Sequence, residues 1–150
     1  TQRSGGSPHD PPADVGGLPR APLLASLGAC KGDGDKPLDP VWGKQPCEHC
    51  KMLVDDRRSA AQVVLPNGDR LYFDDVGCMV AWLDEHRQES RAWVRLPAGD
   101  GWLDARGARY AADAKTPMDF GYVPSSAGEL DYLTVHQRVL ARISETGVAP

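Results

Sequence analysis

The sequence predicts an α+β fold of two small related sub-domains of the strand–strand–helix–strand type, which follow a disordered N-terminal tail. Pro, Gly and Asp dominate the first part of the chain, where almost no periodic apolar pattern occurs. After about residue 40, short alternating segments predict strands, and two segments with apolar residues at helical spacing predict helices. A chain of 150 residues has room for one modest domain or for two small ones that share a core.

The composition narrows the classes of function. Hydrophobic residues make up 41% of the chain and charged residues 25%, which suits a globular protein. The formal net charge is −4 and no basic run occurs, so nucleic acid is not expected as a partner. No Ser/His/Asp set, paired-carboxylate site or phosphate-binding loop stands out, so the sequence gives no basis for predicting an enzyme. The four Cys are too few and too irregularly placed for a disulfide framework, and each needs its own explanation.

Residues 1–40 are expected to form a disordered leader and linker. One apolar island interrupts this segment and ends in Leu27-Gly28-Ala29-Cys30. This end resembles a bacterial lipobox, in which small residues precede a Cys that receives lipid. We therefore expect Cys30 to be a lipidation site, and the alternative is a free Cys in a disordered tail.

Residues 41–97 are expected to form the first α+β sub-domain. The alternating runs predict three strands, at 61–65, 70–73 and 91–96. Pro66-Asn67-Gly68-Asp69 predicts a tight turn that joins the first two strands into a hairpin. Asp74-Asp75 is a capping sequence for a helix from Val76 to about His86.

That helix places two residue types on different faces. Val76, Met79, Val80 and Leu83 follow the spacing of a core-facing stripe. Cys78 lies outside this stripe, and a buried free Cys ordinarily packs as a small apolar residue. Packing is therefore the preferred interpretation of Cys78.

Residues 98–145 are expected to form the second α+β sub-domain. Short strands are predicted at 102–105 and 108–112, with a brief strand end at 122–123. Asp131 is the expected cap of a closing helix that ends near Ser144. His136 falls inside the apolar stripe of this helix, so we expect a satisfied core histidine rather than a ligand.

The sequence Cys47-Glu48-His49-Cys50-Lys51-Met52 brings two thiols and a thioether close together. Cys-x-x-Cys turns occur in zinc sites, thiol redox sites and copper sites alike. Thiolate and thioether sulfurs are soft donors that favour Cu(I) over hard cations, and neither zinc nor a redox pair needs the Met. The segment therefore predicts a soft-metal loop.

Met118 is a candidate for a distant ligand of the same metal. It lies in a Thr116-Pro117-Met118 loop, where the proline fixes the local backbone and no apolar periodicity requires a Met. The alternative is a Met that fills a gap between the two halves of the chain. The residues alone favour neither interpretation.

Together these motifs resemble those of the NosL family of copper-binding lipoproteins, which are accessory to nitrous oxide reductase. The resemblance covers roughly residues 47–123, and the order and spacing of the motifs are specific although each motif alone is weak. The motifs that carry it are Cys47-x-x-Cys50-x-Met52, Phe73-Asp74-Asp75-Val76-Gly77-Cys78-Met79, Trp102-Leu103-Asp104-Ala105, Ala108-x-Tyr110 and Thr116-Pro117-Met118.

The resemblance implies a compact α+β fold of two sub-domains and a single bound Cu(I). By matching position it implies Cys50, Met52 and Met118 as the leading ligands, with Cys47 next. It also implies a periplasmic protein with a lipid anchor, expected in the outer membrane, whose partners are nitrous oxide reductase and the machinery that assembles its copper–sulfide centre. Lys51 stands where many relatives have Gly, and its charge is expected to favour thiolate.

Two alternatives remain open at this stage. The first is a structural zinc module that uses Cys47, Cys50 and Cys78 with His49 or His86. The second is a thiol-disulfide oxidoreductase, in which the Cys-x-x-Cys should open a helix after a strand. Here the motif follows a Pro-containing linker and precedes a Met, which weighs against a redox pair.

Overall fold

The computed structural model describes residues 33–147, which contain a four-stranded sheet, a two-stranded sheet and two α-helices. The predicted α+β class is confirmed. Cys30 and most of the expected tail lie outside the described residues. Within residues 33–147, no helix has both the length and the hydrophobicity needed to cross a membrane.

The larger sheet is antiparallel throughout and has the order β2–β1–β3–β4. The strands are β1 (Ala61–Val64), β2 (Arg70–Phe73), β3 (Arg91–Arg95) and β4 (Trp102–Asp104). β1 and β2 form the predicted hairpin, with Gly68 at φ 89° in the turn. Every residue of the central strand β1 is buried, because both faces of the sheet are covered at this strand.

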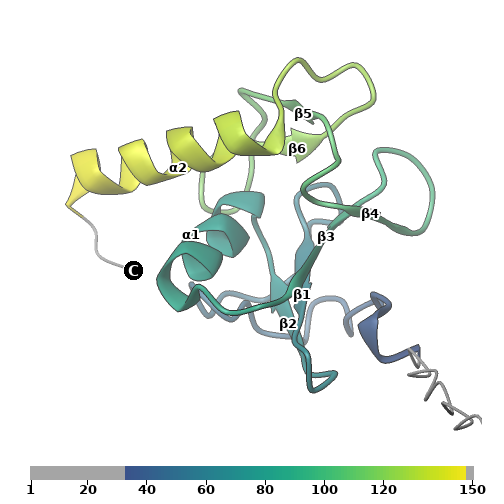
Figure 1. Ribbon diagram of the computed structural model, residues 1–150. Coiled ribbons are helices and arrows are strands. Elements are labelled where there is room, and N and C mark those ends of the chain that lie inside the picture. Colours follow the sequence, from purple (N-terminus) through teal and green to yellow (C-terminus); the bar gives the residue numbers. More distant parts are fainter. Residues whose placement is uncertain (1–32, 148–150) are drawn as a thin grey trace, which may run out of the picture. The chain divides into compact units, whose positions relative to one another are not determined.

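Helix α1 (Val76–His86) packs on β1 and β2, as Figure 1 shows, and its bounds are those that the sequence predicts. Asp75 is its N-cap, and Val76, Met79 and Val80 are fully buried in the core. Helix α2 (Tyr132–Thr146) begins after its predicted cap Asp131 and packs against α1. The two helices therefore form one layer of the structure.

His136 of α2 is more exposed than the sequence indicates. Its side chain is 29% exposed, and Nε2 lies 3.4 Å from an oxygen of Asp84 on α1. The residue thus has a partner, as expected, but this partner is a carboxylate at the helix–helix contact rather than a group in the core.

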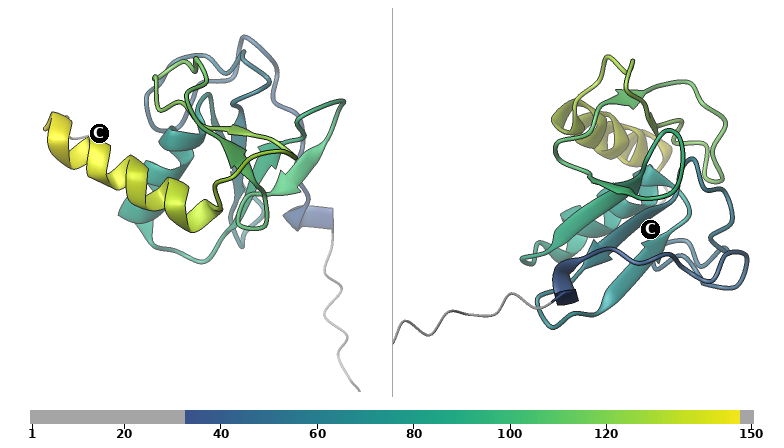
Figure 2. Two further views of the ribbon diagram at one scale, coloured as in Figure 1. Left: turned by 90° about the horizontal axis from the view of Figure 1, so that it is seen from above. Right: turned by 90° about the vertical axis from the view of Figure 1, so that its right-hand side faces the viewer.

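The folded part of the chain begins before residue 41, so the predicted end of the disordered segment is placed too late. The backbone N–H of Leu38 donates to Oε1 of the buried Gln62 (3.0 Å), and the Gln62 amide donates back to the Leu38 carbonyl. Asp39 accepts from Arg95 (2.7 Å) and from the Trp102 indole (2.9 Å). Figure 2 shows this segment crossing the sheet on the face opposite α1. Polar side-chain contacts order the segment, and apolar periodicity does not report them.

The strands expected at 102–105 and 108–112 belong to different sheets. β4 pairs with β3, whereas β5 (Tyr110–Ala111) pairs with β6 (Val123–Pro124). The Pro97–Gly101 segment acts as a hairpin turn, in which the Leu96 N–H donates to the Gly101 carbonyl (3.1 Å). The boundary predicted near residue 97 therefore falls between two paired strands. The division into two related sub-domains stays a prediction.

Candidate metal centre

Backbone hydrogen bonds hold the Cys-x-x-Cys segment in a tight loop. The Cys47 N–H donates to the Met52 carbonyl (2.7 Å), and the Lys51 N–H donates to the Cys47 carbonyl (3.0 Å). The Glu48 N–H donates to the carbonyl of Tyr72 (2.8 Å), which ties the loop to strand β2. The loop therefore carries Cys47 and Cys50 to the end of β2, where α1 begins.

Lys51 closes this loop in the left-handed region, at φ 66°. A side chain costs roughly 1–2 kcal/mol in this conformation, so the position favours glycine. The Lys51 ammonium compensates in part by donating to the Glu48 carbonyl and by pairing with the Glu48 carboxylate at 3.4 Å. Both of these contacts are exposed and contribute little.

The turn from β2 into α1 supplies two more side chains. Asp74 follows β2 directly, and its backbone carbonyl accepts from the Ser59 hydroxyl (2.8 Å), which fixes the turn. Cys78 lies in the first turn of α1. Because the Cys47–Met52 loop is bonded to the end of β2, these residues face the two loop cysteines.

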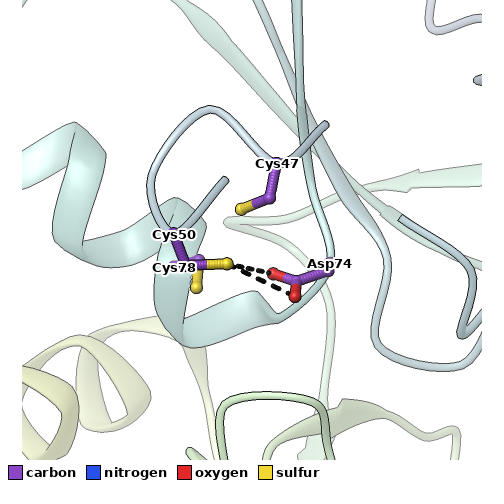
Figure 3. Close-up of side chains that lie close together, drawn as sticks. All are labelled: Cys47, Cys50, Asp74 and Cys78. Atoms are coloured by element: carbon purple, nitrogen blue, oxygen red, sulfur yellow. Dashed lines mark hydrogen bonds between the residues drawn. The ribbon is translucent and has the colours of Figure 1, made fainter. Parts of the chain in front are cut away.

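Cys47, Cys50, Asp74 and Cys78 form one cluster, the metal-site cluster below. One donor atom of each, three sulfurs and a carboxylate oxygen, lie within 4.8 Å of one another. Figure 3 shows the four side chains pointing toward one another. The Cys50 thiol donates to both Asp74 oxygens, at 3.3 and 3.4 Å. Cys47, Asp74 and Cys78 are fully buried, and Cys50 is partly exposed.

The three thiols are not equivalent. A hydrogen bond with the Cys78 thiol lowers the pKa of Cys47 to about 7, against the opposing effect of burial. Burial raises the pKa of Cys50 to about 12. The pKa of Cys78 is also raised, first by its hydrogen bond with Cys47 and then by burial. In the absence of metal, Cys47 is therefore the thiol that ionises first, and the other two hold their protons.

The two histidines considered for a zinc site are not part of the metal-site cluster. His86 stacks on Trp82 with 4.0 Å between ring centroids, and its Nδ1 lies 2.8 Å from the Trp82 carbonyl oxygen. His49 is partly buried, which lowers its pKa. The fourth donor beside the three cysteines is instead the carboxylate of Asp74.

The two methionines predicted as ligands lie at the surface, whereas Met79 is buried in the core. Met52 is 48% exposed and Met118 is 37% exposed. The backbone N–H of Met118 donates to Oδ2 of Asp75 (3.1 Å), so the Thr-Pro-Met loop is fixed beside the residue that follows Asp74. The roles of Met52 and Met118 as ligands stay predictions.

The cluster contains two residues outside the predicted copper ligands: Cys78, which the sequence assigned to a metal only in the zinc alternative, and Asp74. Cys78 is buried, as expected, but it lies among donor atoms instead of in a purely apolar environment. Asp74 was considered only as a helix cap, whereas Asp75 makes the cap and Asp74 contacts Cys50. Asp74 and Cys78 are four apart at a helix start, which suits a shared side, but this spacing does not identify the residues that they face.

Comparison of the chain with protein-family models, curated proteins and solved structures gave no match.

Proposed function

We propose that the chain binds Cu(I) at the metal-site cluster and carries it to a copper enzyme. The observation that supports this is the convergence of three cysteine sulfurs from two segments of the chain, within 4.8 Å of one another and of a carboxylate. Thiolates are the ligands that Cu(I) prefers, and three of them suit its low coordination number. Burial of Cys47 and Cys78 shields the ion from water.

A carrier must also release its ion. Cys50 is partly exposed, and Met52, two residues on, exposes 48% of its surface. An acceptor thus approaches the ion from the side of the Cys47–Met52 loop, and its ligand replaces one of the chain's own through a shared intermediate. The higher affinity of the acceptor gives the transfer its direction.

The resemblance of the motifs to the NosL family supports a specific setting for this activity. In that setting the acceptor is nitrous oxide reductase with the machinery that assembles its copper–sulfide centre. The protein would act in the periplasm, with Cys30 attached to lipid at the outer membrane. Lipid attachment is tested by metabolic labelling with a fatty acid, which a Cys30→Ser variant should abolish.

A structural zinc site is the second candidate, because the fourth donor is a carboxylate. Structural zinc commonly has four tetrahedral ligands, and Zn–S bonds of about 2.3 Å then place two sulfurs about 3.8 Å apart. The four donor atoms here lie within 4.8 Å of one another, so a modest contraction would bring them to this geometry. A thiol-disulfide oxidoreductase is less well supported, because Cys47 and Cys50 lie in a turn and do not open a helix.

Metal competition distinguishes the candidates. The reduced protein is loaded anaerobically with Cu(I) or Zn(II) in the presence of a chelator, and X-ray absorption records the ligands of the bound metal. We expect a Cu(I) site with sulfur ligands only, and loss of most of the affinity in Cys50→Ser and Cys78→Ser. Cys30→Ser is the matched control, because it replaces the one cysteine of the sequence that is not a member of the cluster. A four-coordinate S3O zinc site with weak Cu(I) binding would overturn the proposal.

A further inference from the structure

The loop of residues 116–121 is attached to the start of α1 through one buried carboxylate. Asp75 is fully buried, and both of its oxygens accept backbone hydrogen bonds. Oδ1 accepts from the Gly77 N–H (2.9 Å), which caps α1. Oδ2 accepts from the Met118 N–H (3.1 Å), which lies 43 positions away in the sequence.

Further contacts press this loop onto the helix. Thr116 also hydrogen-bonds Asp75 through its side chain, and its hydroxyl oxygen accepts from the Gly121 N–H (3.1 Å). Phe120 packs so closely on Gly77 that a Cβ at this glycine would lie 2.0 Å from the ring. On the far side, Arg142 of α2 donates to the Asp119 carbonyl and lies over the Phe120 ring.

Helix capping alone does not account for these contacts. The cap of α2, Asp131, is exposed and bonds within its own first turn, where Oδ1 accepts from the Thr134 N–H (2.8 Å). Asp75 does the same through Oδ1 but directs its second oxygen to a distant loop. Burying a carboxylate costs free energy unless hydrogen bonds compensate for the lost water. Asp131 caps α2 from an exposed site, so capping by itself does not explain why Asp75 is buried.

Asp74 and Asp75 connect the metal-site cluster to the 116–121 loop. The Asp74 side chain accepts from the Cys50 thiol, and the next side chain along the chain holds the Met118 backbone. The loop is thus fixed relative to the donor atoms through two adjacent residues.

We propose that Asp75 is a positioning residue, which holds the 116–121 loop so that the Met118 thioether binds the ion at the metal-site cluster. This inference rests on the proposed function. Met118 then supplies a neutral, exposed sulfur next to the buried thiols, and Asp75 determines how long that sulfur stays on the ion.

Asp75→Asn is the appropriate test. Asparagine caps helices about as well as aspartate, so α1 keeps its cap. Its amide has a single oxygen, however, and the NH2 group in place of the second oxygen faces the N–H of Met118. The variant therefore separates the loop from the helix without removing the cap. We expect Cu(I) to pass to a competing chelator about tenfold faster than from the wild type, which corresponds to about 1.4 kcal/mol.

A spectroscopic measurement separates positioning from general weakening. The sequence has three Met, so Met118 is the only one left in a Met52→Leu/Met79→Leu background. This protein is labelled with selenomethionine, loaded with Cu(I), and its selenium edge is recorded. We expect a copper neighbour of selenium when Asp75 is present and loss of that neighbour in Asp75→Asn. Thr116→Val should weaken the signal, and Thr116→Ser should restore it.

The outcomes distinguish this inference from the proposed function. Sulfur-coordinated Cu(I) without a copper–selenium signal overturns the inference and leaves the proposed function standing. A copper–selenium signal that Asp75→Asn leaves unchanged also overturns it. If Cu(I) binds neither to the protein with Asp75 nor to its Asp75→Asn variant, the inference and the proposed function both fail.

Discussion

The starts of α1 and α2 follow the same local rule and serve different purposes. Each is capped by an aspartate, Asp75 or Asp131, whose side chain accepts a backbone N–H of the first turn. The start of α1 is buried, adjoins the metal-site cluster and holds a second loop. At the start of α2 the cap Asp131 is exposed, and within residues 33–147 its side chain accepts hydrogen bonds only from its own first turn. Capping residues thus predict where a helix begins, while the environment decides what else the cap does.

The largest contrast is expected two residues after each cap. Gly77→Ala places a Cβ 2.0 Å from the Phe120 ring, so the loop or the helix must move. We expect a loss of about 2–3 kcal/mol in the free energy of unfolding, typical of overpacking. Leu133→Ala at the matching position of α2 removes a side chain that is 63% exposed and should change stability by less than about 0.5 kcal/mol. Urea unfolding measures both, and equal effects would contradict the comparison.

The caps themselves should differ next. Asp75→Ala removes two acceptors from buried N–H groups, so we expect a loss of about 2 kcal/mol. Asp131→Ala removes one exposed acceptor, and its effect should be clearly smaller. Thermal unfolding of the two variants under one buffer condition provides the measurement. A larger effect at Asp131 than at Asp75 would contradict this comparison.

Metal binding should act on one helix start only. With Cu(I) bound, we expect slower amide hydrogen exchange in residues 74–79 and in the Cys47–Met52 loop, because both segments carry ligands of the proposed site. Residues 131–135 of α2 should exchange at the same rate with and without metal. Mass spectrometry of peptides from the apo and loaded protein tests this, and equal protection of both helix starts would point to a general tightening of the fold instead.

The smallest expected effect concerns pH. Hydrogen bonds from Thr134 lower the pKa of Asp131 below its usual value of 3.8. A carboxylate with a lowered folded-state pKa stabilises the protein above the unfolded-state pKa, and this contribution is lost as the pH falls through the folded-state value. The Asp131→Asn variant should therefore lose less stability than the wild type below about pH 4. The measurement is the free energy of unfolding of both proteins from about pH 5 to about pH 2, the range in which such carboxylates titrate. A stability difference that stays constant over this range would refute the prediction.

The elements predicted well are those with local signals. The hairpin of β1 and β2 has its Asn-Gly turn, and α1 and α2 have aspartate caps and apolar stripes, so each was predicted to within a few residues. The pairing of β4 with β3 was missed because the Pro97–Gly101 segment reads equally well as a boundary or as a turn. That residues 36–40 are structured was not predicted, because their structure depends on the buried side-chain amide of Gln62.

Only the part of the metal-site cluster that has a local sequence signal was predicted. Cys47 and Cys50 are neighbours in the sequence, so their convergence is a local property of the turn. Cys78 joins them only because the Glu48–Tyr72 hydrogen bond places the loop at the end of β2. Asp74 and Asp75 look alike in the sequence, and only the direction of each side chain shows which contacts a thiol and which caps the helix. Such assignments depend on tertiary structure, which a single sequence does not encode in its spacing.

Two of the three cluster thiols are also core residues. Cys47 and Cys78 pack among the apolar side chains that hold α1 on the sheet, and neither has any exposed surface. Because the fold already holds these sulfurs together, binding an ion would cost little conformational entropy. The same rigidity determines the order in which the thiols would release an ion. Cys50 is partly exposed, so its side chain can move without disturbing the core. An ion leaving this protein would part from Cys50 first and from the two core sulfurs last.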